Sequence, residues 1–211
     1  MLIQCGEGPV AGLSAMITAR AGGKARPFVV ALDGRSGAGK STLARLLGGL
    51  LEAVVIEGDD FYAGGTALRD DSPAVRADAC IDWMRQRPVL AALREGREAI
   101  WRAFDWQAFD GRLCDRPTRV APRPVVILEG VYAARPELAD LVDLRVLIAP
   151  PEPVRLARLL AREGEITAWD RQWHEAEAWY FRTRMPPAAF DVVFGEAHWM
   201  ATPAGPRSDT S

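Results

Sequence analysis

The chain has 211 residues, of which 49% are hydrophobic and 26% are charged, and its formal net charge at pH 7 is −2. This length suits one well-buried domain and is too short for two ordinary domains with a linker. The near balance of charge argues against a basic nucleic-acid surface, and no apolar run reaches the ~18 residues that a membrane span needs. We therefore expect a small-molecule substrate, with neither nucleic acid nor membrane as a partner.

The cysteines and the N-terminus indicate the cellular compartment. Cys5, Cys80 and Cys114 are odd in number and show no C-x-x-C spacing, so free thiols are favoured over a disulfide framework or a zinc site. The N-terminus lacks the basic region and the continuous apolar run of a signal peptide. We expect a cytoplasmic protein and leave its oligomeric state open, a homo-oligomer included.

The predicted elements follow an N-terminal extension, residues 1–26, in which residues 10–20 could form a short helix against the body. Apolar, β-branched runs predict five buried strands, at residues 28–32, 53–57, 124–128, 144–148 and 190–194. Helical patterns lie at residues 42–47, 78–95, 136–141, 150–162 and 168–184. Residues 201–211 are polar and predict a flexible tail.

This alternation of continuous apolar strands with helices predicts an α/β fold. We expect residues 27–200 to form one domain, a five-stranded parallel sheet with helices on both faces. Residues 63–123 separate the second and third strands by an unusually long excursion. Excursions of this length are usually functional, which predicts a substrate-binding or lid insert.

A glycine-rich loop joins the first predicted strand to the first predicted helix. Residues 34–41 match G-x-x-x-x-G-K-[ST] in the strand-loop-helix context that this motif requires. The glycines let successive backbone N–H groups converge on an anion, and the helix adds its positive N-terminal end. Lys40, one of only two lysines with Lys24, supplies charge to the β and γ phosphates, and Ser41 is placed to hold Mg²⁺. The predicted ATP contacts are Gly34, Arg35, Ser36, Gly37, Ala38, Gly39, Lys40, Ser41 and Thr42.

Acids follow the second and third predicted strands, at the sheet edge where α/β proteins bind ligands. Asp59 could accept the proton of a substrate hydroxyl and direct its oxygen at the γ-phosphate. Asp60 is the rival for this role, because one residue along the chain points to the other face. Glu129 could bind Mg²⁺ directly or through a water.

Arginines and aromatic residues mark the C-terminal helices. Arg155, Arg158 and Arg162 recur at spacings of three and four and so share one helix face. They could close over the triphosphate and neutralise its charge, or form an ordinary solvated face. We interpret Trp169 and Trp173, with Tyr180, as core packing rather than a ligand cage.

Taken together, these residues resemble the uridine kinase and phosphoribulokinase family of P-loop kinases. The motifs follow the family's order over residues 27–195, as DGRSGAGKST (33–42), DDFY (59–62), FDW (104–106), ILEG (127–130) and RLAR (155–158). The resemblance implies transfer of the γ-phosphate of ATP to a primary hydroxyl of a nucleoside or similar polyol. It also implies that the arginine helix is the family's lid.

Position by position, the resemblance assigns further roles. It implies that Asp59 is the catalytic aspartate, that Tyr62 contacts the substrate and that Phe104 packs on the nucleobase. Asp82 matches, in a looser part of the alignment, the aspartate that binds ribose hydroxyls.

The chain departs from the family at the base pocket. Phe104 lacks the hydroxyl of the family's base-contacting tyrosine, and Phe109 falls near the position of a histidine that contacts uracil. Residues 163–165 also replace a longer basic lid loop. Because sites built on hydrogen bonds discriminate better than apolar ones, these departures weaken the expectation of uridine itself as the acceptor.

We therefore expect a P-loop kinase that uses Mg-ATP, with Asp59 orienting the acceptor hydroxyl. Lys40, Arg158 and Arg162 would stabilise the transferring phosphoryl group, and Arg155 would join the ATP contacts. The expected acceptor contacts are Asp59, Tyr62, Arg69, Asp82, Phe104, Trp106 and Glu129, and the expected metal ligands are Ser41 and Glu129.

Two alternatives share most of these residues. The first is a kinase of a non-nucleoside metabolite, such as a sugar, an amino alcohol, an antibiotic or a coenzyme precursor. The second is a nucleotide-binding regulator without transferase activity, which would keep the phosphate loop but would not need Asp59.

Overall fold

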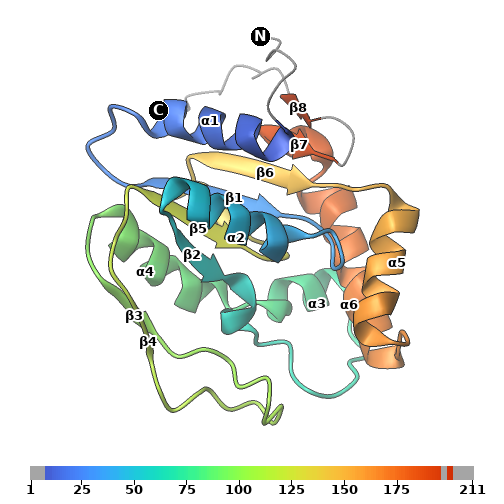
Figure 1. Ribbon diagram of the computed structural model, residues 1–211. Coiled ribbons are helices and arrows are strands. Elements are labelled where there is room, and N and C mark those ends of the chain that lie inside the picture. Colours follow the sequence, from blue (N-terminus) through green and yellow to red (C-terminus); the bar gives the residue numbers. More distant parts are fainter. Residues whose placement is uncertain (1–7, 196–198, 202–211) are drawn as a thin grey trace, which may run out of the picture.

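The computed structural model describes residues 8–195 and 199–201 (Figure 1). Its main sheet has six strands in the order β2-β5-β1-β6-β7-β8. Five of them are parallel, which confirms the predicted α/β fold, and β8 is antiparallel to β7. The strand bounds are β1 Phe28–Asp33, β2 Val54–Glu57, β5 Val125–Glu129, β6 Leu144–Ile148, β7 Val192–Phe194 and β8 Trp199–Ala201.

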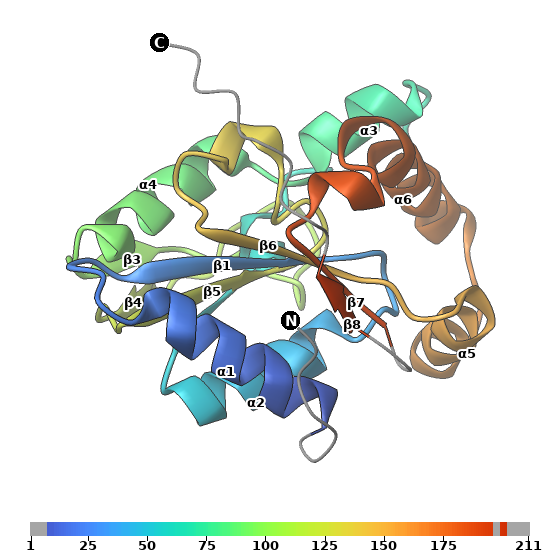
Figure 2. The same ribbon diagram turned by 90° about the horizontal axis from the view of Figure 1, so that it is seen from above.

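Helices cover both faces of this sheet (Figure 2). On one face lie α1 (Pro9–Ala21) and α2 (Lys40–Leu51), whose buried leucines and isoleucine meet Phe28, Val30 and Leu32 of β1. On the other face lie α3 (Pro73–Cys80), α4 (Trp83–Arg94) and α6 (Ala168–Trp179), in the core that contains Val29 and Ala31. Successive side chains of β1 thus alternate between the two cores, as the pleat of a strand requires. The expected helix at residues 10–20 is therefore α1, and it packs against the body.

The strand register brings the chemically interesting ends together. β1 lies between β5 and β6, and Leu32 pairs with Glu129 while Glu57 of β2 pairs with the same Glu129. Because all three strands are parallel, the segments that follow them leave the sheet at one edge. α5 (Glu152–Glu163) stands beside this edge (Figure 1).

Two predicted helices are wrong in their extent. Residues 136–141 form only the short 3₁₀ turn η2 (Pro136–Leu138). Residues 78–95 do not form a single helix, because the chain breaks between α3 and α4. Ile81 is extended, with φ −120° and ψ 126°, and forms a β-bridge with Tyr62. The Asp82 carboxylate then accepts a hydrogen bond from the Arg85 backbone N–H and starts α4. Asp82 is an N-cap, a role for which its short acidic side chain is well suited.

Two short strand pairings were not predicted. β3 (Ala99–Trp101) and β4 (Thr118–Val120) form an antiparallel pair within the insert 63–123. The second is the antiparallel pairing of β8 with β7, and β8 includes Ala201, the first residue of the predicted tail. Residues 202–211 and Cys5 lie outside the described residues. Within the described ranges, no helix combines the length and the apolar character that crossing a membrane would require.

Candidate active site

The glycine loop lies between β1 and α2, as the motif predicts. Gly37 has φ +81°, and a Cβ at this position would lie 2.8 Å from the Arg155 carbonyl oxygen, so only glycine fits. Gly39 is the N-cap of α2 and brings no side chain to the first turn. The unpaired N–H groups of that turn and the buried Lys40 are therefore available to an anion. Lys40 Nζ donates to the Arg35 carbonyl oxygen at 3.2 Å, which holds it at the loop.

Ser41, in the first turn of α2, and Glu129, the last residue of β5, form the part of the site that suits Mg²⁺. The Ser41 hydroxyl is hydrogen-bonded to the Glu129 carboxylate, and both line a small pocket with Glu57 and Arg45. Burial raises the pKa of Glu129, while Lys40 and the Ser41 hydrogen bond oppose the rise. The described residues contain no cluster of three metal-ligating side chains. This donor set still fits Mg²⁺, which takes one or two protein oxygens and completes its shell with phosphate and water.

A cleft of about 450 Å³, separate from the small pocket at Ser41, adjoins the glycine loop at Ser36. Its walls come from the 3₁₀ turn η1 (Gly58–Phe61), the junction of α3 and α4, the segment after β5, the end of α5 and one face of α6. The cleft therefore joins the glycine loop to the insert and to the two C-terminal helices. A small acceptor bound there would lie next to a bound triphosphate.

Asp59 lines this cleft and Asp60 does not. The Asp59 side chain is open to the cleft, yet surrounding protein excludes much of the water, and this desolvation raises its pKa. Lys40 lowers the pKa of Asp59 and Glu177 raises it, which shows that the acid lies within the electrostatic reach of both. Asp60 instead accepts a hydrogen bond from Trp101 Nε1 at 2.7 Å. The geometry therefore favours Asp59 over its rival.

Aromatic side chains surround Tyr62 at one end of the cleft. Ring centroids of Trp106, Trp169 and Trp173 lie 4.9, 6.3 and 5.9 Å from that of Tyr62, and all four residues line the cleft. Phe104 is 4% exposed and packs behind Tyr62 at 5.0 Å, so it supports the wall rather than forming it. Trp173 belongs to the core, as predicted, but the core interpretation was incomplete because the same residue also faces the cleft.

The three arginines of α5 have different surroundings. Arg155 is buried, donates to the Ser36 carbonyl oxygen at 2.7 Å and directs its other nitrogens at Glu152, so it braces the loop. Arg158 Nη1 lies 3.5 Å from the Cβ position of Gly39, over the loop. Arg162 lines the acceptor cleft and lowers the pKa of Asp59. Arg158 and Arg162 thus border the two sides of the loop, whereas Arg155 holds its backbone.

Four predicted acceptor contacts do not line the cleft. Phe104 packs behind Tyr62, and Glu129 lines the small pocket with Ser41 instead. Arg69 pairs with Asp71 and donates to the Gly64 carbonyl oxygen, and it does not line the cleft. Asp82 also lies outside the cleft lining, because its carboxylate caps α4.

Glu177 is a cleft residue that the sequence reading missed. It is 3% exposed and accepts hydrogen bonds from the Ser36 backbone N–H at 3.0 Å and from the Ser36 hydroxyl. Trp169, Trp173 and Glu177 are spaced by four residues, which places them on one face of α6. That spacing was the available signal for a shared helix face, and the contacts of Glu177 show that this face is turned to the glycine loop and the cleft.

Asp33, the last residue of β1, is the second residue that the reading missed. It is fully buried, and its carboxylate accepts hydrogen bonds from the backbone N–H groups of Gly34, Tyr132 and Ala134 at 2.8 to 3.0 Å. The Tyr180 hydroxyl adds a fourth, at 3.0 Å. Burial raises the pKa of Asp33 to about 6, against the opposing effect of these donors and of Lys40. One carboxylate thus joins the glycine loop, the segment after β5 and the π-helical turn η3 (Tyr180–Arg184).

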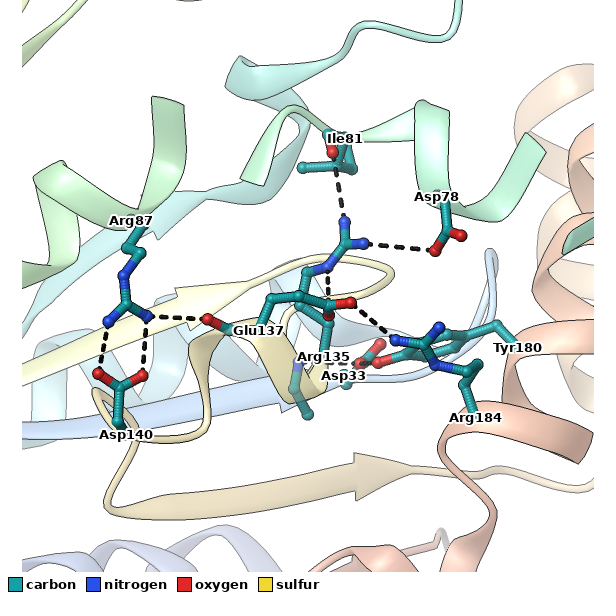
Figure 3. A network of polar contacts seen from close by, with 10 residues as sticks. Asp33, Asp78, Ile81, Arg87, Arg135, Glu137, Asp140, Tyr180 and Arg184 are labelled. Carbon is teal, nitrogen blue, oxygen red and sulfur yellow. Dashed lines mark hydrogen bonds and ion pairs between the residues drawn. The ribbon is translucent and has the colours of Figure 1, made fainter. Parts of the chain in front are cut away.

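A larger polar network supports the segment after β5 (Figure 3). Arg135, in this network, is 3% exposed. Its guanidinium contacts Glu137 at 3.0 Å and donates to the Ile81 carbonyl oxygen at 3.3 Å. Arg184 pairs with Glu137 from the other side, at 2.7 Å. The network therefore ties the break between α3 and α4 to the walls of the cleft.

The chain is similar to several known kinases. It is 23% identical over 151 residues to a uridine kinase from Clostridium botulinum, with 65% of this chain and 69% of that protein covered. Its structure resembles that of a possible uridine kinase from Bacillus stearothermophilus, with a TM-score of 0.65, 21% identity and coverage of 88% of this chain and 96% of that one. A D-glycerate 3-kinase from Cryptococcus neoformans has a TM-score of 0.59 at 16% identity, with coverage of 93% and 100%.

At these identities the structural likenesses establish the fold alone. The family model described as "Phosphoribulokinase / Uridine kinase family" matches residues 29–168, which include the glycine loop, Asp59 and Glu129. That match covers more than half of the chain. Together with the loop, the cleft and the strand order, it means that this chain belongs to the phosphoribulokinase and uridine kinase family of P-loop small-molecule kinases.

Proposed function

We propose that this protein transfers the γ-phosphoryl group of ATP to a hydroxyl group of a small, nucleoside-like acceptor bound in the cleft. The observation that carries the proposal is the position of Asp59. It lines the cleft that adjoins the glycine loop, and its pKa responds to Lys40 of that loop. An alcohol bound in the cleft would therefore lie next to a polyphosphate bound at the glycine loop.

In the proposed reaction, the acceptor oxygen forms a bond to the γ-phosphorus while the bond from that phosphorus to the β,γ-bridging oxygen breaks. ADP leaves, and the hydroxyl proton passes to Asp59. Because desolvation raises the pKa of Asp59, its carboxylate is a better proton acceptor than an exposed aspartate. Lys40 and the N-terminus of α2 hold the phosphates in place, and Arg158 and Arg162 border the transferring group.

Mg²⁺ belongs to this proposal as the ion that neutralises phosphate charge when it is bound. Ser41 and Glu129 would hold it, because their oxygens lie beside Lys40 at the start of α2. A cytoplasmic location and a small-molecule partner also belong to the proposal. The unpaired thiols of Cys80 and Cys114 suit a reducing compartment.

A nucleoside-like acceptor is supported by the flat aromatic walls at Tyr62 and Trp106 and by the similarity to uridine kinases. A kinase of another hydroxylated metabolite is the second candidate. It is favoured by Phe104, which is buried behind Tyr62 and has no polar atom to read a base.

The test is an ADP-release assay against nucleosides, sugars and amino alcohols, followed by Asp59→Asn with Asp60→Asn as the matched control. We expect Asp59→Asn to lower kcat by about 10²–10⁴-fold and to leave ATP binding unchanged. Asp60→Asn should retain most of the activity, because its carboxylate faces Trp101. Full activity of Asp59→Asn would overturn the mechanism, and ATP binding without turnover of any alcohol would favour the regulator.

A further inference from the structure

The acceptor cleft is unusually rich in acids. Five carboxylates line it and one guanidinium does, so its formal charge is −4 when all are ionised and His174 is neutral. The acids are Glu57, Asp59, Glu163, Asp170 and Glu177, and the cation is Arg162. Arg162 is itself paired with Glu163 at 2.7 Å, so its charge is largely committed within the cleft wall.

Aromatic rings line the same cleft as these acids. Tyr62, Trp106, Trp169 and Trp173 converge with centroid separations of 4.9 to 6.3 Å among the pairs that contact one another. Trp106 is 44% exposed, so part of its ring remains available to a ligand. Faces of tryptophan and tyrosine carry negative quadrupole charge and attract cations, above all organic ammonium groups that shed water easily.

We propose that the acceptor of this kinase carries a positive charge: it is an amino-bearing or quaternary-ammonium alcohol whose cation lies among the rings of Tyr62, Trp106 and Trp169. This inference rests on the phosphoryl transfer of the proposed function, and for the acceptor it favours the second candidate, a non-nucleoside alcohol, at the same site. The hydroxyl end of such a molecule would lie at Asp59, and the cationic end in the aromatic part of the cleft.

Two polar groups of the cleft wall lack partners among the described residues. Trp173 is 7% exposed and its Nε1–H has no hydrogen-bond partner among the described residues. Tyr132 is 2% exposed, and its hydroxyl is likewise without a partner in the described part of the chain. Both residues line the cleft. Both atoms lie beneath the cleft surface, where buried polar groups normally find partners, so this wall of the cleft is incompletely satisfied among the described residues.

Charge also separates the acceptor classes. An anionic acceptor, such as a sugar phosphate, would meet five carboxylates and, among the described lining residues, the single cation Arg162, which already borders the transferring phosphoryl group. A neutral alcohol would gain nothing from that field. A cation gains from both the carboxylates and the rings, so selectivity should follow the charge of the acceptor more than its shape.

The test compares choline with 3,3-dimethylbutan-1-ol, in which carbon replaces the charged nitrogen. Binding to the full chain is followed by tryptophan fluorescence, since Trp106, Trp169 and Trp173 line the cleft. We expect choline to bind at least about ten-fold more tightly, as a partly desolvated cation–π contact allows. Equal affinities, or no choline-dependent change in fluorescence, would overturn the proposal.

A matched pair of variants locates the effect. Glu163→Gln removes one carboxylate of the cleft, whereas Glu165→Gln removes an exposed acid two residues away that does not line it. The first should weaken choline binding several-fold without changing the affinity of the neutral alcohol, and the second should change neither. Equal effects of the two variants would contradict a local role of the cleft acids.

Turnover separates this inference from the proposed function. Amino alcohols should exceed their neutral counterparts in kcat/KM by at least about ten-fold. If choline binds selectively but no alcohol is phosphorylated, the kinase proposal fails and the proposal of a cation-binding cleft stands. If neutral alcohols are phosphorylated as well as cationic ones, the kinase stands and this inference fails.

Discussion

Replacing Asp33 by asparagine should flatten the dependence of the unfolding free energy on pH between about 4 and 6. Asp33 is fully buried, and its pKa is raised from 3.8 to about 6. The folded chain therefore holds this proton more tightly than the unfolded chain. The stability that Asp33 contributes is complete below the unfolded pKa and is lost as pH rises through the folded pKa.

The magnitude follows from the shift. A rise of about two pKa units, at 1.36 kcal/mol per unit, corresponds to about 3 kcal/mol lost over this window by the wild-type chain. In the Asp33→Asn variant the side chain is neutral at every pH, so the loss disappears. The amide nitrogen of the variant would also face the Ala134 N–H, which costs about 1–3 kcal/mol at all pH values and shifts the curve without tilting it.

The assay is urea unfolding of wild type and Asp33→Asn at several pH values from 4 to 7.5. Other carboxyls with raised pKa values, such as Asp59 and Glu129, are present in both chains and cancel in the difference. The difference between the two unfolding free energies should therefore change by about 3 kcal/mol across the window. Parallel curves would refute the reasoning, because Asp33 would then titrate equally in the folded and unfolded chains.

Other substitutions test the site itself. Gly37→Ala should abolish ATP binding in a calorimetric titration, because its Cβ would lie 2.8 Å from the Arg155 carbonyl oxygen. In the control Gly49→Ala the new Cβ meets nothing within 4 Å, so ATP binding should be unchanged and helix stability should rise by up to about 1 kcal/mol. Equal effects of the two variants on ATP binding would contradict this reasoning. Lys40→Ala should weaken ATP binding at least about ten-fold, while Lys24→Ala, which loses a partly exposed pairing with Asp143 and a contact with the Phe28 ring, should not. Glu177→Gln removes a charge that raises the pKa of Asp59, so the acid limb of the kcat/KM profile should move to lower pH. An upward shift would mean that Glu177 does not act on Asp59 electrostatically.

The sequence predicted the structure best in segments whose local residue pattern matches their place in the fold, namely the buried strands and the glycine loop. Strands of a parallel sheet are buried on both faces and read as continuous apolar runs, which is why β1, β5 and β6 were predicted within one residue. The glycine loop was predictable because its motif records backbone geometry directly. Gly37 has φ +81°, a backbone conformation that favours glycine, and the motif records this directly.

The errors arose where distant segments decide the outcome. Residues 78–95 carry a partly helical pattern, but Ile81 pairs with Tyr62 and breaks the helix. Arg155 was expected at the phosphates, yet Glu152 and the Ser36 carbonyl take its donors. Glu177 meets Ser36 across 141 positions of sequence, a contact that no local pattern records.

The most direct test of the account is to identify the product by ³¹P NMR of the wild-type protein with Mg-ATP and the best acceptor from the screen. If Asp59 and the glycine loop act on one pair of substrates, ADP should appear together with an equal amount of a phosphomonoester of the acceptor. ADP accompanied only by inorganic phosphate, with the acceptor unchanged, would show that the cleft does not present an alcohol to the γ-phosphate and would contradict the account.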